Sequence, residues 1–453
     1  MRFLKKHINI LLLISILIIF PRCRKINLEL LVFESKKAGH WEDRPVGISC
    51  MPEFSEYTIE NNEFTFNPNH MFCIAINMDT LDFEIMRYES RFGPSILESE
   101  GKIAKAVFIE YKYQCDVPFP AEYNWYSADV KIDGISLSNV GIRKKGFWGS
   151  IFSEAPAIKI NTTKYNQNQI IGKTENITLN NNAEDPTRVV QVLYYKVFEL
   201  ANYPAPRCNL ANITINGEPF GVYSHLEAID LNFLQRQFGN NNGHLYEGQL
   251  VDFRTKWLPR WDSKTEYTNQ YGTPILDISN VLENSSDQNL VHDLNQYLNV
   301  EKFITFWALE IILNHSDGYA TKRNNFFIYF NPNDNNRAIF IPWGLNTLDD
   351  GYNSYERYVT AELPRRLSRI PETRQMLINE LNRIFEEVWK EDELISLIDF
   401  FSEQVQTAQI DDSYQEHLNY LKKIIRNRRN NIDIMLKNGL PEGNEKAAKN
   451  CCR

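Results

Sequence analysis

Apolar and polar residues alternate in several runs of the first half of the chain, a pattern that predicts β-strands. These runs lie at residues 70–76, 106–113, 127–135, 140–143 and 157–161. The third run ends in Asp133-Gly134, a dipeptide typical of a two-residue hairpin turn. A second hairpin is expected where residues 211–215 and 221–226 flank Asn216-Gly217.

Later in the chain, apolar residues recur at the spacing of α-helices. Asp185-Pro186 predicts a helix start, with Asp as N-cap and Pro in the first turn. Residues 300–313 and 372–401 also carry helical periodicity. Between them, residues 325–343 predict a hairpin closed by the sequence NPND. A strand-rich part followed by a helix-rich part predicts an α+β fold with two lobes.

The amino-acid composition excludes several classes of protein. The chain has 453 residues, of which 43% are hydrophobic and 13% aromatic, so it can bury a large core and is not disordered. The net charge of -9 argues against a nucleic-acid partner, because binding to the phosphate backbone requires clustered Lys and Arg. The chain contains neither a G-x-S-x-G elbow nor histidines at zinc-ligand spacing, which argues against those two kinds of site.

The N-terminus predicts export. Arg2, Lys5 and Lys6 precede an apolar run at residues 8–20, which is shorter than the roughly 20 residues of a spanning helix. Cys23 follows where a bacterial lipoprotein would be acylated. Residues 1–23 are therefore expected to be a signal peptide or a lipoprotein or membrane anchor, and this choice stays open. The protein is expected in the cell envelope or secreted, touching membrane only through that anchor or lipid.

The pattern of apolar and polar residues also suggests the remaining domain boundaries. Residues 24–68 read as an N-terminal extension, residues 69–440 as the main domain and residues 441–453 as a tail. The chain has seven cysteines and no C-x-x-C sequence, so disulfides are possible in an exported protein but their pairing stays open.

A phosphate site is suggested by glycines and basic side chains around residues 140–149. Gly141 and Gly146 have the spacing of a P-loop, but Phe147-Trp148 follow where Lys and Ser or Thr would be needed. We instead expect a loop between two strands whose backbone amides approach phosphate oxygens, with Arg143, Lys144 and Lys145 adding positive charge. Lys159 lies on the next strand between apolar neighbours, as does the lysine that holds phosphates in kinases.

Several segments in order extend this pattern. They are residues 140–146 (VGIRKKG), 157–159 (AIK), 179–181 (LNN), 215–223 (INGEPFGVY), 314–317 (NHSD), 325–329 (NFFIY) and Pro342-Trp343, with Asp185, Arg188 and Glu227 between them. Together they resemble the CotH kinase family of atypical secreted kinases, over roughly residues 70–435. The resemblance implies a two-lobed kinase-like fold that binds ATP with Mg²⁺ or Mn²⁺ and phosphorylates Ser or Thr of envelope or coat proteins.

The resemblance also implies roles for individual residues. Lys159 would contact the nucleotide phosphates and Asp317 would be the catalytic base. Asn325 would bind metal or phosphate, and Glu227 would lie near the adenine or ribose. Gly141, Arg143 and Gly146 would complete the nucleotide site.

One motif departs from the family pattern. The family's Trp-Asp-x-Asp supplies two metal-binding carboxylates, whereas this chain reads Trp343-Gly344-Leu345-Asn346. Glycine offers no ligand, and the Asn346 amide binds Mg²⁺ less well than a carboxylate does. Asp349 or Asp350 could replace the lost ligands if the loop took another path. Three functions therefore stay open: an active kinase, a catalytically degenerate pseudokinase-like binding or scaffolding module, and an adhesin-like envelope protein in which the site has no role.

Overall fold

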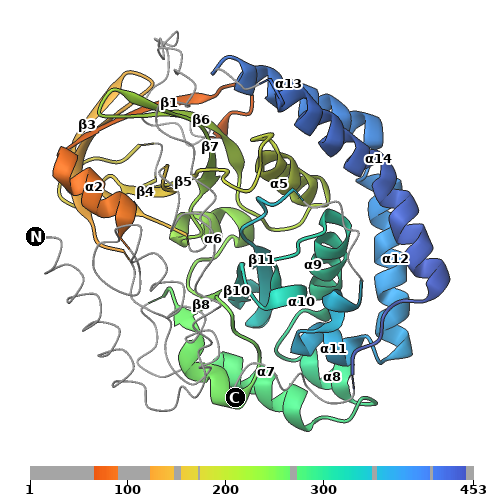
Figure 1. Cartoon of the computed structure of the whole chain (residues 1–453). Coiled ribbons are helices and arrows are strands. Elements are labelled where there is room, and N and C mark those ends of the chain that lie inside the picture. The colour runs from red at the N-terminus through yellow and green to blue at the C-terminus, as the bar shows by residue number, and fades with distance from the viewer. Residues whose placement is uncertain are drawn as a thin grey trace, which may run out of the picture. The chain divides into compact units, whose positions relative to one another are not determined.

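The computed structural model describes residues 66–89, 123–146, 155–171, 174–265, 273–348, 355–408 and 412–444. All of them belong to one unit, Trp41–Arg453. The fold is α+β, with a strand-rich part followed by a helix-rich part, as the sequence predicts (Figure 1). The predicted strand at 106–113 and the expected leader at 1–23 lie outside the described residues.

Seven strands form a closed barrel in the order β1-β2-β3-β4-β5-β7-β6. Their bounds are β1 Phe72–Met78, β2 Tyr126–Ile132, β3 Ile135–Lys144, β4 Ile158–Asn161, β5 Asn176–Asn180, β6 Cys208–Ile215 and β7 Glu218–Glu227. Neighbouring strands are antiparallel except β1 and β6, whose parallel pairing closes the barrel. The two predicted turns, Asp133-Gly134 and Asn216-Gly217, join β2 to β3 and β6 to β7.

The barrel interior is filled by alternate residues of its strands. Ile142, Ile158, Ile160 and Ile177 are at most 3% exposed and belong to one apolar cluster. Because successive side chains of a strand point to opposite faces, their neighbours face outward. This alternation positions the polar residues of the site described below.

A second sheet has the order β11-β10-β8-β9. Its strands are β8 Leu245–Gly248, β9 Asp262–Ser263, β10 Phe326–Asn331 and β11 Arg337–Pro342. Every residue of β10 is buried. Phe326 and Ile328 join the main core, whereas Phe327 and Tyr329 pack into a separate cluster with α6 (Leu231–Phe238). Both faces of β10 are therefore covered.

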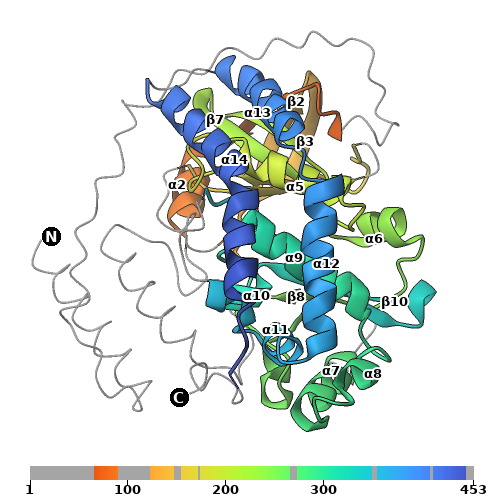
Figure 2. The same cartoon turned by 90° about the vertical axis from the view of Figure 1, so that its right-hand side faces the viewer.

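Besides α6, the described part of the chain contains ten further α-helices. They are α2 Thr80–Tyr88, α5 Val190–Leu200, α7 Thr273–Asn284, α8 Leu290–Leu294, α9 Val300–Leu313, α10 Tyr319–Lys322, α11 Glu362–Leu367, α12 Pro371–Glu387, α13 Glu391–Gln406 and α14 Tyr414–Asn438. Helix α9 contacts β11 and α12, and α13 contacts α14 and α5 (Figure 2). No helix of the described part is long and apolar enough to cross a membrane.

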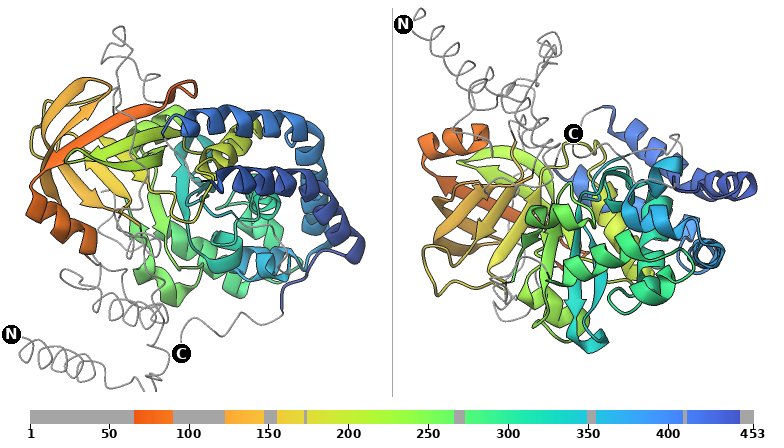
Figure 3. Two further views of the ribbon diagram at one scale, coloured as in Figure 1. Left: turned by 45° about the horizontal axis from the view of Figure 1, so that its top comes forward. Right: turned by 90° about the horizontal axis from the view of Figure 1, so that it is seen from below.

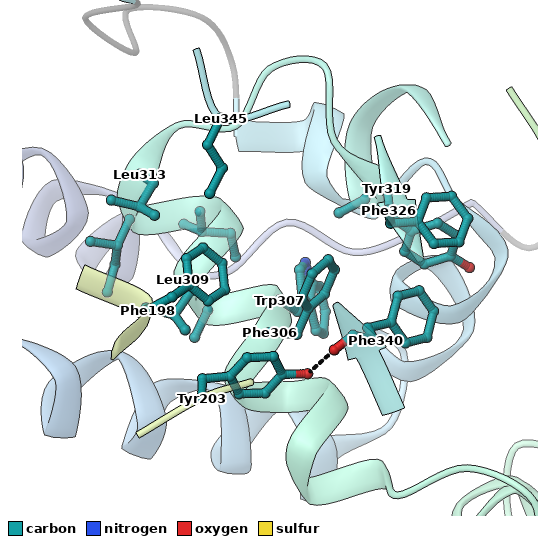
Figure 4. Close-up of a cluster of buried hydrophobic side chains, with 14 of the residues drawn as sticks. Phe198, Tyr203, Phe306, Trp307, Leu309, Leu313, Tyr319, Phe326, Phe340 and Leu345 are labelled. Carbon is teal, nitrogen blue, oxygen red and sulfur yellow. Dashed lines mark hydrogen bonds between the residues drawn. The ribbon is translucent and has the colours of Figure 1, made fainter. Parts of the chain in front are cut away.

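Aromatic side chains join the sheet to α9. Phe306 lies 5.1 Å and Phe326 5.5 Å from Phe340, measured between ring centroids. The Tyr203 hydroxyl donates a hydrogen bond to the Phe340 carbonyl at 3.0 Å (Figure 4). The barrel lies beside this core, with α14 on the side of the core away from the barrel (Figure 3).

Three sequence predictions need correction. Asp185 does not begin a helix: its carboxylate accepts hydrogen bonds from the backbone amides of Thr187 and Val190, each at 2.8 Å, and so holds a turn ahead of α5. Gly141 lies inside β3, in agreement with the strand predicted at 140–143, and not in the loop expected to approach phosphate. The helix expected over 372–401 is two helices, α12 and α13, separated at residues 388–390.

Candidate functional site

A cleft of about 1230 Å³ lies between the outer face of the barrel and the second sheet. One wall comes from β3, β4 and β5, and another from the loop after α9 and the start of β10. The cleft is large enough for a nucleotide, because drug-sized ligands occupy pockets of about 300–1,000 Å³. It contains Lys159 and Asp317 together, as the sequence predicts.

The barrel wall is built by strand register. Arg143 on β3 is paired with Lys159 on β4, which is paired with Thr178 on β5. Paired residues of adjacent strands point to the same face of a sheet. All three therefore lie on the outer face and line the cleft.

Arg143, Lys144 and Lys145 are consecutive basic residues at the end of β3, and their side chains alternate between the outer and inner faces of the barrel. Arg143 and Lys145 have the parity of the outer face, whereas Lys144 points inward and is fully buried. The Lys144 ammonium donates to the carbonyls of Arg87 at 2.8 Å and Glu89 at 3.1 Å. Burial, opposed in part by the Glu89 charge, lowers the pKa of Lys144 to about 7.

Lys145, which the sequence predicts to add positive charge to the phosphate site, lines the cleft. Its ammonium lies 5.8 Å from the centre of the Trp343 ring. Burial lowers the pKa of Lys145 to about 8; the nearby Glu247 carboxylate opposes this shift and the Lys159 charge adds to it. Lys145 comes two residues after Arg143 and so has the same strand parity, which distinguishes it from the inward-facing Lys144.

Glu247 is held by a second lysine. The Lys264 ammonium lies 2.7 Å from a carboxylate oxygen of Glu247 and 2.7 Å from one of Asp262. Burial lowers the pKa of Lys264, but these two carboxylates outweigh burial and hold it above its usual range. Lys264 is therefore neutralised within the protein.

The glycines of the predicted phosphate loop have different roles. Gly146 lines the cleft with φ at +84°, a conformation that favours glycine. Gly141 is absent from the cleft lining, and a Cβ atom there would lie 2.6 Å from the Lys164 side chain and 3.0 Å from Trp125. Gly141 is thus required for packing beneath Lys164, and it does not line the cleft.

The opposite wall depends on a buried carboxylate at the end of α9. Glu310 is fully buried and accepts hydrogen bonds from the backbone amides of Tyr319 at 2.8 Å and Ala320 at 2.9 Å. A Cβ atom on Gly318 would lie 2.0 Å from the Glu310 carboxylate, so only glycine fits. These contacts fix the loop that carries Asp317.

Asp317 accepts hydrogen bonds from amide groups on one oxygen and an ammonium on the other. The side-chain amides of Asn324 and Asn325 donate to Oδ2 at 3.1 and 2.8 Å. The Lys322 ammonium lies 3.1 Å from Oδ1. An ionised carboxylate has about four acceptor positions, so Asp317 can accept one further hydrogen bond from a ligand hydroxyl.

Residues 343–346, which replace the family's Trp-Asp-x-Asp motif, pack against the wall that carries Asp317 and add no carboxylate to it. Gly344 has φ at +64°, and a Cβ atom there would lie 2.6 Å from the Asn325 side chain. Asn346 lines the cleft, and Thr347 donates to the Glu184 carboxylate at 3.0 Å. Asp349 and Asp350 lie outside the described residues.

The described residues form no ready-made site for a divalent cation. No three His, Cys, Asp or Glu side chains of the described segments gather where they could hold a metal ion. Asn325 turns its amide nitrogen, a donor, toward both the carboxylate and the carbonyl of Asp317. The Asn325 amide thus holds the Asp317 carboxylate and adds no second carboxylate beside it.

Glu227 lies beside the cleft rather than in it. Its carboxylate pairs with Arg207 at 2.9 Å and with Arg236, and it does not line the cleft. The three residues that follow, 228–230, do line it. The connection after β7, and not Glu227 itself, therefore forms this part of the cleft.

Six of the predicted site residues meet in the cleft: Arg143, Gly146, Lys159, Asp317, Asn325 and Asn346. The model of the family described as CotH kinase protein matches residues 154–432, more than half of the chain. The chain belongs to the CotH kinase family. Lys159, Asp317 and Asn325 lie within the matched segment, whereas Arg143 and Lys145 precede it.

Relatives with curated names include three CotH proteins of Rhizopus delemar. Invasin CotH2 is 23% identical over 187 residues, covering 38% of this chain and 31% of the relative. Invasin CotH3 is 24% identical over 173 residues, covering 35% of this chain and 29% of the relative. The matched region thus spans less than a third of each of these CotH proteins.

Among solved structures, the complex of HipA with HipB and operator DNA from Shewanella oneidensis is 12% identical to this chain. The match covers 62% of this chain and 59% of that one, with a TM-score of 0.28. At this TM-score the likeness supports no conclusion about the CotH fold or its activity.

We predict that Gly344→Asp, which restores the first acidic residue of the family motif, will not create a metal site. The new side chain would need φ at +64° and would meet Asn325, so the free energy of unfolding should fall by about 1–3 kcal/mol. Denaturant unfolding and Mn²⁺ titration check both effects. Asn346→Asp, which adds a carboxylate at a cleft residue without this clash, is the matched control. A Gly344→Asp protein that is as stable as the parent and binds Mn²⁺ would contradict the prediction.

Proposed function

We propose that this CotH family member is an atypical protein kinase that transfers phosphate from ATP to Ser or Thr hydroxyls. One observation carries the proposal: Lys145 and Lys159 on the barrel line the same cleft as Asp317. Phosphoryl transfer needs cations around the phosphates and a group that orients the attacking hydroxyl. The cleft supplies both from its two walls.

Each wall would have a distinct part in the reaction. Lys145, Lys159 and Arg143 would hold the phosphates, and the exposed Gly146 backbone allows their close approach. Arg143 is already positioned, since its guanidinium lies 4.5 Å from the centre of the Trp125 ring. Asp317 would accept the hydrogen bond of the acceptor hydroxyl at its remaining acceptor position and take up its proton. No step of the proposal depends on a bound divalent cation.

The acceptor and compartment follow from the N-terminal sequence and from the family. The basic residues before the apolar run at 8–20 support export. We therefore propose Ser and Thr of envelope or coat proteins as acceptors. Contact with membrane would come only through an N-terminal anchor or lipid.

A second function is favoured by Gly344 and Asn346. Without the family's two carboxylates, the cleft could bind nucleotide and transfer nothing. The protein would then be a pseudokinase-like binding or scaffolding module whose partner recognises the nucleotide-bound form. Both functions include ATP binding, but only the kinase transfers phosphate. Measuring ATP binding and phosphate transfer together therefore distinguishes them.

We predict that Asp317→Asn lowers the rate of phosphate transfer about 10²- to 10⁴-fold, because the variant loses the base. Lys159→Met should instead weaken ATP binding by about tenfold through the loss of one charged contact. Incorporation of ³²P into Ser/Thr peptides and calorimetric ATP titration check the two effects. Lys196→Met is the matched control, since Lys196 pairs with Glu199 on the surface of α5.

The outcome distinguishes the functions. Full-length protein that binds ATP but transfers no more phosphate than Asp317→Asn is the pseudokinase-like module. If neither ATP binding nor transfer is detected, the cleft is not a nucleotide site, and the adhesin-like function remains.

We also predict that ATP affinity falls as the pH rises. The pKa of Lys145 is about 8 in the free protein, so above that pH the side chain is neutral and must take up a proton to contact phosphate. Between pH 7.5 and 9.5 the dissociation constant should rise roughly tenfold.

Two variants isolate this effect. Lys145→Met should weaken binding at pH 7.5 and flatten the pH profile, and Lys145→Arg, which stays charged, should flatten it without loss of affinity. Lys144 titrates near pH 7 but faces the barrel interior, so it contributes equally in all variants. A decline of the same size in Lys145→Met would show that another group is responsible.

A further inference from the structure

Lys322 is a cleft cation that neither the sequence prediction nor the proposed mechanism uses. It is the last residue of α10 and lines the cleft beside Asp317. Its ammonium lies 3.1 Å from Oδ1 of Asp317, and its side chain is 58% exposed. The cationic group therefore lies at the carboxylate that, in the proposed function, would orient the acceptor close to the terminal phosphate of ATP.

The surroundings of Asp317 favour an anion over a cation. Three groups point donor hydrogens at this carboxylate: the Lys322 ammonium and the amides of Asn324 and Asn325. Gly344, the residue that packs against Asn325, brings no oxygen ligand from its side chain. Donor hydrogens and an ammonium bind phosphate oxygens, whereas a divalent cation needs oxygen ligands.

The charged side chains that line the cleft also favour an anionic ligand. Apart from Lys144, which faces the barrel interior, five basic and four acidic side chains line the cleft. Two of the four acidic groups, Glu247 and Asp317, are already paired with Lys264 and Lys322. The net positive charge suits a polyphosphate that is not neutralised by a metal ion.

We infer that Lys322 takes over part of the metal's role: its ammonium contacts the terminal phosphate of ATP, so that nucleotide binds in this cleft without a divalent cation. The inference rests on the proposed nucleotide binding and is independent of phosphate transfer. An exposed ion pair contributes little to stability, so Lys322 can turn from Asp317 to a phosphate oxygen at small cost. The same movement frees Oδ1 of Asp317 for the acceptor hydroxyl.

The test is calorimetric titration of the full chain with ATP and with ADP, first in EDTA and then with excess MgCl₂. The parent protein should bind ATP in EDTA with an affinity within about threefold of that in MgCl₂. Lys322→Met should weaken ATP binding in EDTA roughly tenfold and ADP binding less than threefold, because ADP lacks the terminal phosphate. Lys322→Arg should retain ATP binding, and Lys196→Met should behave as the parent.

Each other outcome is decisive. If ATP binds only with MgCl₂, or if Lys322→Met and the parent have equal affinity in EDTA, the inference is overturned and the proposed nucleotide site survives. If nucleotide binds under neither condition, the proposed function fails and the inference fails with it. Thermal unfolding of each variant shows whether a lost affinity reflects a misfolded protein, and the charge-retaining Lys322→Arg then decides the matter.

Discussion

Packing inside the barrel determines where the charges of the cleft lie. Ile158 and Ile160 on β4 must fill the interior, and this forces Lys159 between them to the outside. The pairing of β3 with β4 then places Arg143 beside Lys159. A shift of one residue in this register would bury Lys159 and expose both isoleucines. The apolar core therefore holds the cations in place without any direct contact among them.

A second buried group fixes the other wall. Glu310 bonds two backbone amides of the loop after α9, and Gly318 leaves room for its carboxylate. A buried carboxylate with fixed hydrogen-bond partners is costly to move, since an unpaired charge in the core is strongly unfavourable. Asp317 thus extends from a rigid support, as a base or an anchor for ligand would require. The cleft combines this support with the register of the barrel.

Much of this arrangement could be predicted from the sequence. The strand alternation identified β4 and the two hairpin turns, the helical periodicity identified α9 with its bounds, and the family resemblance located Lys159 and Asp317. The remainder depends on tertiary contacts. Gly141 is needed because Lys164 packs above it, and Glu227 is bound by two arginines that are distant in sequence or on the next helix. Lys322 precedes Asn325 in a stretch without periodicity, so only the folded loop shows that it reaches Asp317.

The most direct test of the cleft is a crystal structure of the full chain with a non-hydrolysable ATP analogue, grown without divalent cations. We expect the phosphates within hydrogen-bond distance of the Lys145 and Lys159 ammonium groups, with the terminal phosphate beside Lys322 and Asp317. A nucleotide bound elsewhere, or phosphates that leave both barrel lysines without contact, would contradict the idea that the two walls form a phosphate site.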